Sequence, residues 1–386
     1  MSDAVVVGAG MVPFGKYPQT PITTIGADAV VAAMRDAGVG RAGVDAIYSG
    51  NSYGGSLVAQ RVVRNLGLGG IPVVNVENAC SSSATALREA FHAISLGVHE
   101  TVLVLGVEKL TALGGGPLPL NAEDQEAANG QIMPAVYAMR ARRYLHERSL
   151  SPRDLAEVAV KARRHGTLNP YAYQRTHTTV DEVLASRPVA TPLTLLQSCP
   201  SVDGAAALVV TTTKNAKQFT GEPVHIRASV LHSGEFETGF HDMTVADITM
   251  RSAHEAYAQA GITPQDLDVV ELHDAFTIAE LFYYEALQLA APGNAIDLLR
   301  SGFTTFGGKT VVNPSGGLLA KGHPVGATGA AQAVEIVWQL RGQAEGRQVA
   351  GARFGLTHAT GGGMAGVDHG ACAIHIFERT TAGAST

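Results

Sequence analysis

Residues 73–90 read VVNVENACSSSATALREA and place a cysteine between an apolar strand and a helix. The apolar run ends before Asn78 and Cys80, and the pattern from there to about Leu96 predicts a helix. Unpaired N–H groups at a helix start favour a thiolate, by roughly 0.3–1 kcal/mol at exposed sites, and can bind an oxyanion. The small residues that follow leave room for a bulky acyl group. By itself, this stretch fits a nucleophile and an inert core thiol equally well.

The composition excludes several classes of protein. Of the 386 residues, 46% are hydrophobic and 16% are charged, which suits two fused halves or one large α/β unit. A net charge of -6 gives no reason to expect nucleic-acid binding. Cys80, Cys199 and Cys372 are widely spaced, which argues against a disulfide framework or an internal metal site. With no leader and no apolar run of 18 residues, we expect a cytoplasmic protein without membrane contact.

Strands and helices alternate in the first part of the chain. We expect helices at about 22–37 and 57–66 and strands at about 45–50, 72–76 and 101–110. Short links between them predict a parallel sheet covered on both faces. The first turn has Gly8 and Gly10 of a dinucleotide fingerprint, but Pro13 replaces its third glycine, so we interpret it as a tight strand-to-loop turn.

The alternation repeats in the second part of the chain. After TVVNPSGG at 310–317 comes a Gly-rich turn, a helix and a closing strand, much as in the first part. We therefore expect two similar α/β halves, residues 1–221 and 222–386. Arg- and Tyr-rich helices at about 113–200 form an insertion in the first half.

Two histidines accompany the cysteine. VVELHDAF at 269–276 ends a strand at His273 and leads into an amphipathic helix, and His323 lies within NPSGGLLAKGHPVGATG at 313–329. The glycines of that second motif would let the backbone come close to a ligand. Either histidine alone is more often structural than catalytic. Together with Cys80 they form a nucleophile–base set.

These motifs resemble the thiolase superfamily over nearly the whole chain. NACSSSATA at 78–86 is similar to its nucleophile motif, and HDAF occupies the position of its usual Asn-Glu-Ala-Phe. NPSGGLLAKGHPVGATG is a family signature, and ATGGG at 359–363 resembles the usual Cys-x-Gly-Gly-Gly loop. The resemblance implies a thiolase fold, with two βαβαβαββ halves in five α-β-α-β-α layers. It also implies a tight homodimer and acyl-CoA substrates.

The resemblance also assigns roles. Cys80 would attack the ketone of a 3-oxoacyl-CoA and become acylated, while His323 takes the thiol proton. His273 would help to hold an enolate oxygen, and the N–H groups of Cys80 and Gly361 would form a second oxyanion hole. Coenzyme A would be the co-substrate and lie across the insertion, with no permanently bound cofactor and no metal.

One catalytic group of the family is missing. The second cysteine is replaced by Ala359 in the ATGGG loop, and by Ala275 at the HDCF position that some sterol-carrier members use. A methyl group performs no acid–base chemistry. Either His358 or Asp274 serves instead, or a water does, or the reaction is not a standard thiolysis. Cys199 and Cys372 lie in apolar, strand-like contexts, where we expect core residues.

Further details resemble the sterol-carrier, lipid-transfer branch. HDAF, FGKYP at 14–18 and QSCPSVDGAAA at 197–207 resemble this branch. Within it, VNVENAC at 74–80 and GVDHGACAIHIF at 366–377 resemble members that work with a small zinc-ribbon and OB-fold partner, such as benzoylsuccinyl-CoA thiolase and steroid side-chain aldolases. The implied function is thiolytic cleavage of a bulky or branched 3-oxoacyl-CoA, in lipid or aromatic degradation. A retro-aldol acyl-CoA lyase and a non-catalytic acyl-CoA or lipid carrier remain alternatives. Retention of Cys80 favours acyl transfer.

Overall fold

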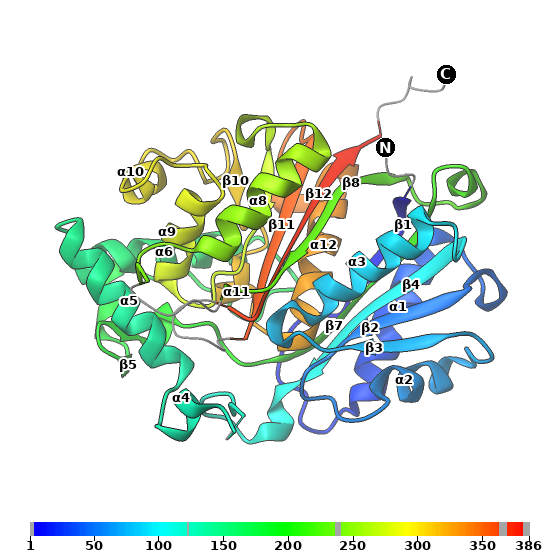
Figure 1. Cartoon of the computed structure of the whole chain (residues 1–386), viewed down its shortest axis with the longest axis horizontal. Helices are drawn as coiled ribbons and strands as arrows, with labels where there is room; N and C mark the ends of the chain where they lie inside the picture. Colours follow the sequence, from blue (N-terminus) through cyan, green and yellow to red (C-terminus); the bar gives the residue numbers. More distant parts are fainter. Residues whose placement is uncertain (1–3, 122, 236–240, 363–368, 381–386) are drawn as a thin grey trace.

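The chain folds around a mixed sheet of ten strands, seen in a computed structural model that describes residues 4–121, 123–235, 241–362 and 369–380 (Figure 1). The strand order is β10-β9-β11-β12-β8-β1-β7-β4-β2-β3. The strands of the first half are β1 (Ala4–Met11), β2 (Ala46–Gly50), β3 (Val73–Val76), β4 (Thr101–Lys109) and β7 (Asp203–Thr212). Those of the second half are β8 (Val224–His232), β9 (Val269–Glu271), β10 (Val311–Val312), β11 (Phe354–Gly361) and β12 (Ala371–Arg379).

The two halves have the same topology. Numbered within each half, both sets of five strands follow the order 3-2-4-5-1, which confirms the predicted βαβαβαββ repeat. Within the described part of the sheet, the two sets of strands meet where β1 and β8 pair, at Val5 with His225 and Val6 with Val224. The predicted boundary at residue 221 falls in the link between β7 and β8, and it stays a prediction.

The expected parallel pairing is confirmed for the strands near 45–50, 72–76 and 101–110, but the complete sheet is mixed. Only β2, β3 and β4, and likewise β9, β10 and β11, pair in parallel. The last strand of each half runs antiparallel to both of its neighbours in that half. The insertion precedes β7, and no helix lies between β11 and β12 among the described residues.

Two helices lie between the strands of the two halves and form the middle layer. They are α3 (Ser82–Ser95) and α12 (Thr328–Arg341), and Leu87 and Val334 on them share one apolar cluster with Leu208 of β7 and Ile226 of β8. Thirteen of the 14 residues of α12 are buried, as expected for a helix covered on all sides.

The other large helices cover the outer faces. Along β1, Val6 points into the middle layer while Val5 and Val7 pack toward α1 (Ile22–Ala37) and α2 (Val58–Leu66). On the far side, α8 (Asp247–Ala260), α9 (Thr277–Ala286) and α10 (Ala295–Arg300) pack in a third cluster. These clusters confirm the five layers. No helix in the described ranges is both long and apolar enough to cross a bilayer.

The insertion packs against the second half, at the lower left of Figure 1. Its elements are α4 (Gln125–Ala128), α5 (Met133–Glu147), α6 (Pro152–Gly166), α7 (Val180–Ala185), β5 (Pro188–Ala190) and β6 (Leu193–Thr194). Lys161 of α6 forms a buried ion pair with Glu280 of α9 and donates to the Tyr284 hydroxyl at 3.0 Å. Because α5 and α6 cover it, α9 is buried on nearly all sides, and the predicted amphipathic character of this helix is wrong.

Candidate active site

Cys80 lies in a short 3₁₀ turn, Ala79–Ser81, between β3 and α3. The turn is held by the Ser82 hydroxyl, which accepts from the Asn78 N–H at 3.0 Å and donates to the Ala79 carbonyl at 2.6 Å. Ala79 has a left-handed backbone, with φ of 48°. Cys80 itself stays partly exposed, on the wall of a cavity.

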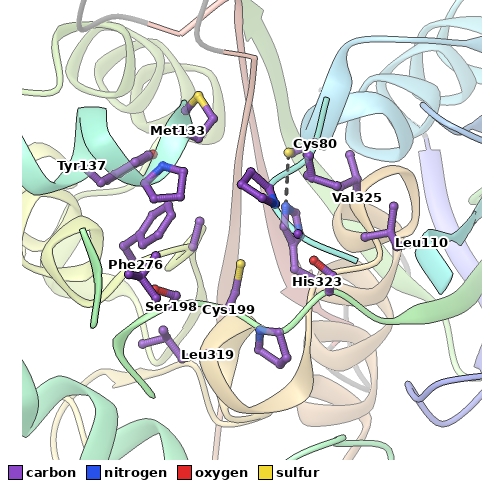
Figure 2. A pocket seen from close by; sticks show the side chains of 18 of the residues that line it. Cys80, Leu110, Met133, Tyr137, Ser198, Cys199, Phe276, Leu319, His323 and Val325 are labelled. Atoms are coloured by element: carbon purple, nitrogen blue, oxygen red, sulfur yellow. Dashed lines mark hydrogen bonds between the residues drawn. The ribbon is translucent and has the colours of Figure 1, made fainter. Parts of the chain in front are cut away.

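His323 lies in the turn between α11 (Gly317–Lys321) and α12, and its Nε2 is 3.2 Å from the Cys80 Sγ (Figure 2). Its Nδ1 lies 2.8 Å from the Thr328 hydroxyl, which in turn donates to the Pro324 carbonyl at 3.3 Å. Because the Thr328 hydroxyl donates its one proton to the Pro324 carbonyl, it accepts a hydrogen bond from Nδ1–H of His323. The free lone pair of Nε2 then faces the thiol, as a general base requires.

Burial keeps this pair neutral. Burial first, and the nearby Glu108 carboxylate next, raise the pKa of Cys80 to about 12. Burial also lowers the pKa of His323 to about 3. The expected stabilisation of a thiolate at the helix start is therefore outweighed, although the N–H groups of Cys80 and Gly362 oppose the shift.

His273 is the third member of the cluster. It follows β9, and its ring centroid lies 5.1 Å from that of His323, with the rings nearly perpendicular. One ligand atom from each of Cys80, His273 and His323 lies within 4.8 Å of the others. Such a set has the donor types of a metal site, so the expectation of no metal stays a prediction. Nδ1 of His273 is buried without a hydrogen-bond partner among the described residues.

The glycines at the end of β11 allow it to approach the nucleophile closely. A Cβ at Gly361 would lie 2.0 Å from the Asn78 carbonyl oxygen, so no other residue fits without a shift. The backbone N–H that lowers the pKa of Cys80 belongs to Gly362, which directly follows β11. The predicted donor is Gly361, one residue earlier. The oxyanion role of Gly361 stays a prediction, and residue 363 of the motif lies outside the described residues.

The glycines of the 313–329 motif approach protein atoms rather than a ligand. A Cβ at Gly317 would lie 2.2 Å from the Asp274 carboxylate, and one at Gly329 would lie 2.6 Å from the Ala84 nitrogen. These positions allow α11 and α12 to pack tightly against β9 and α3, and so fix His323.

Neither auxiliary acid–base candidate lines the cavity. His358 is fully buried, with its Nε2 2.9 Å from the Thr249 hydroxyl. The Asp274 carboxylate accepts from the Leu318 N–H at 2.7 Å, at the start of α11. Both side chains are used to position neighbouring segments, which removes the geometric basis for their auxiliary roles.

The two remaining cysteines differ. Cys372 is fully buried in the core cluster, which confirms its prediction. The expectation that Cys199 also lies in the core is wrong, since this residue is only partly buried and lines the cavity beside Ala275. The apolar residues around Cys199 in the sequence do not show that its side chain faces a cavity in the folded chain.

The cavity has a volume of about 850 Å³ and is formed largely by the insertion. Tyr137 and Phe276, with ring centroids 4.6 Å apart, form a wall opposite Cys80 and His323 (Figure 2). The lining includes Lys16, Arg163 and Arg187 but, among the described residues, no carboxylate. Arg163 and Tyr137 were missed because nothing in an isolated helix shows which face meets a cavity.

Comparison with known families decides the assignment. A family model described as the thiolase N-terminal domain matches residues 4–214, and one described as thiolase C-terminal domain-like matches residues 232–371. The chain belongs to the thiolase family. As a thiolase it is an acyltransferase, in agreement with the names of its relatives.

This thiolase has relatives along nearly its whole length. It is 41% identical to the benzoylsuccinyl-CoA thiolase subunit BbsB of Thauera aromatica, over 93% of this chain and 94% of that one. It is 39% identical to an acetyl-CoA acetyltransferase of Methanothermobacter thermautotrophicus, over 98% and 100%. Sterol carrier protein 2 of Gallus gallus is 38% identical, over 93% and 70%.

Solved structures agree with the fold. The Ltp2-ChsH2(DUF35) aldolase superposes on this thiolase with a TM-score of 0.85 at 27% identity, over 98% of this chain and 99% of that one. Human mitochondrial 3-ketoacyl-CoA thiolase gives a TM-score of 0.73 at 20% identity, over 98% and 99%, which supports the fold alone.

Proposed function

We propose that this enzyme cleaves a 3-oxoacyl-CoA with coenzyme A and carries the acyl group on Cys80. The observation that carries this proposal is the hydrogen bond of 3.2 Å between Sγ of Cys80 and Nε2 of His323, on the wall of a large cavity. Nucleophile, base and orienting Thr328 form the arrangement that covalent acyl transfer requires.

The neutral pair would ionise only as the substrate reacts. Sγ of Cys80 attacks the ketone carbon while its proton passes to His323, because neither group is charged beforehand. Backbone N–H groups at Cys80 and at Gly361 or Gly362 would then bind the oxyanion. Removing one such donor typically lowers the rate about 10²–10³-fold. His273 would hold the oxygen of the thioester enolate released by C–C cleavage.

The substrate proposed is a bulky or branched acyl-CoA, of which benzoylsuccinyl-CoA is an example. The aromatic wall of Tyr137 and Phe276 suits an aryl group, and one relative is named for that substrate. Arg163 is buried and has no recorded ion pair or side-chain hydrogen bond in the described ranges. A carboxylate on the substrate would supply its missing partner.

We further propose a homodimer that works with a small zinc-ribbon and OB-fold partner in the cytoplasm. One relative is named as a subunit, and the name of one structural neighbour includes DUF35. Coenzyme A would be the co-substrate and would lie across the insertion, without a permanently bound cofactor.

A retro-aldol acyl-CoA lyase is the second candidate, because one of the neighbours is named an aldolase. A lyase needs no acyl-cysteine, and neither does a non-catalytic carrier. Intact-mass measurement with a 3-oxoacyl-CoA separates the three classes. We expect one acyl adduct on the wild-type chain and none on Cys80→Ser. Full turnover by Cys80→Ala would favour the lyase, and no chemistry at all would favour the carrier.

A further inference from the structure

The proposed thiolysis needs an acid that the family motifs do not supply. Cleavage leaves an electron pair on the α-carbon, which must receive a proton. The two positions where a cysteine would provide it hold Ala275 and Ala359. Of the other candidates, His358 and Asp274 do not line the cavity. The proton must therefore come from another cavity residue or from water.

Cys199 lies directly beside one of the two vacated positions. Its N–H donates to the Ala275 carbonyl at 2.9 Å, and the adjacent residues Ser198 and Phe276 form an antiparallel bridge. Residues 199 and 275 are thus opposite each other on neighbouring extended segments. Side chains of such pairs lie on the same face, with Cβ atoms roughly 4.5–5.5 Å apart. A thiol at 199 therefore lies within a few ångströms of where one at 275 would be.

The sulfur of Cys199 is available for chemistry. It forms no recorded hydrogen bond within the described ranges, and it is a free thiol, partly exposed to the cavity. In Figure 2 it points into the space between His323 and the wall formed by Tyr137 and Phe276. Burial first, and the nearby Cys80 sulfur next, raise the pKa of Cys199, so it carries its proton at neutral pH.

A second feature of the cavity points to an enolate at this place. His273 lines the same cavity, and its buried Nδ1 has no partner among the described residues. Burial and the neighbouring His323 hold the pKa of His273 well below its usual range. A neutral imidazole can donate one hydrogen bond to an oxygen without charging the site. His273, as a hydrogen-bond donor to the enolate oxygen, and the Cys199 thiol, as a proton donor to the α-carbon, would then face the same ligand.

We propose that Cys199 is the catalytic acid that protonates the α-carbon, a relocated counterpart of the cysteine missing at positions 275 and 359. The assignment rests on the proposed thiolysis. Cys80 first bonds to the ketone carbon and passes its proton to His323. The bond to the α-carbon breaks, and its electron pair forms the thioester enolate held by His273.

Cys199 then gives its S–H proton to the α-carbon, which releases the CoA thioester that contains the α-carbon (acetyl-CoA from an unbranched substrate) and leaves a Cys199 thiolate. The thiolate recovers a proton from solvent while incoming coenzyme A loses its thiol proton to solvent, and the sulfur of coenzyme A attacks the acyl group on Cys80 to form the shortened acyl-CoA. The Cys80 thiolate departs and recovers its proton from His323. Every proton is thereby restored without an added oxidant or metal.

The test compares two half-reactions of the full chain. Benzoyl-CoA acylates Cys80 without any proton transfer at carbon, whereas single-turnover cleavage of benzoylacetyl-CoA needs the acid. We expect Cys199→Ala to slow cleavage about 100-fold or more, the usual contribution of general acid catalysis, and to change acylation less than threefold. Acylation also reports that the variant is folded. Cys372→Ser, which alters a thiol outside the cavity, is the matched control.

Rescue makes the test specific. In the Cys199→Ala background, Ala275→Cys should restore at least a tenth of the wild-type cleavage rate, because the paired position lies on the same face. Equal cleavage by Cys199→Ala and wild type would overturn the assignment, and so would a wild type that acylates but does not cleave. A wild type that is never acylated would instead overturn the proposed thiolysis.

Discussion

Nε2 of His323 lies 3.2 Å from Sγ of Cys80, and burial keeps both groups uncharged. This differs from a preformed thiolate–imidazolium pair, in which the nucleophile is permanently reactive. A neutral pair stays unreactive toward solvent and oxidants until a carbonyl arrives to accept the developing charge. In the proposed mechanism, this arrangement would couple activation of the thiol to binding of the substrate.

The first prediction concerns the pH dependence of Cys80 alkylation. With a pKa raised to about 12, the thiolate fraction is small at pH 7 and grows about tenfold per pH unit up to pH 10. The rate constant for iodoacetamide at Cys80, followed by peptide mass mapping, should rise across that range without a plateau. A plateau below pH 8 would show that the free enzyme already holds a thiolate.

The second prediction separates the two histidines. His323→Ala should lower the rate of Cys80 acylation by benzoyl-CoA about 10²–10⁴-fold, because the thiol loses its base. His273→Ala should leave acylation within about threefold and slow cleavage of benzoylacetyl-CoA at least tenfold, because the enolate oxygen loses a donor. Losses in acylation of the same size for both variants would contradict these separate roles.

The third prediction concerns Thr328. Thr328→Val keeps the shape of the side chain but removes the acceptor for Nδ1–H of His323. The buried N–H then lacks a partner, and the imidazole is free to place its proton on Nε2, facing the thiol. We expect about a 10–100-fold loss of acylation, with unchanged hydrogen-exchange protection of the α12 backbone. Gln332→Leu, one turn further along α12 and outside the cavity, is the control for disturbing this helix.

The fourth prediction addresses Arg163. If its guanidinium pairs with a substrate carboxylate, Arg163→Leu should raise KM for benzoylsuccinyl-CoA at least tenfold and leave KM for the neutral benzoylacetyl-CoA within about twofold. Equal increases for both substrates would instead place the arginine against a coenzyme A phosphate. Arg187→Leu, an exposed cation on the cavity rim, serves as the comparison.

The fifth prediction concerns the partner subunit. The purified chain should dimerise by light scattering but turn over slowly, and addition of a small zinc-ribbon and OB-fold protein from the same operon should raise kcat/KM at least tenfold. Full activity of the chain alone would rule out an obligatory partner and leave the mechanism at Cys80 unaffected.

Much of this architecture was readable from the sequence, because it depends on local patterns. Apolar runs bounded by glycines gave the strands, and the recurrence of strand, small-residue turn and helix gave the two halves. Cys80, His273 and His323 stand at strand ends and helix starts, where α/β folds gather functional side chains, and the structure brings all three together.

The rest depends on contacts between distant segments. Cys199 looks like a core residue in its own sequence context, and only its pairing with Ala275, 76 positions later, shows that its sulfur faces the cavity. The pKa of Cys80 likewise reflects atoms from both halves, which reasoning from the helix start alone could not include. The burial of α9 was missed for the same reason, because the insertion covers it.

The two middle helices connect the repeat to the chemistry. Cys80 precedes α3 and His323 precedes α12, the equivalent helix of the other half, and the two helix starts are held together where the Ala330 N–H donates to the Ser83 hydroxyl at 2.9 Å. The proposed nucleophile and base thus lie at equivalent positions of the repeat, Cys80 in the first half and His323 in the second. We therefore expect the activity to depend on how closely the two halves are docked, as in a heterodimer whose two subunits have been fused. Fragments divided between β7 and β8 would each be inert, and catalysis would return only with their reassociation.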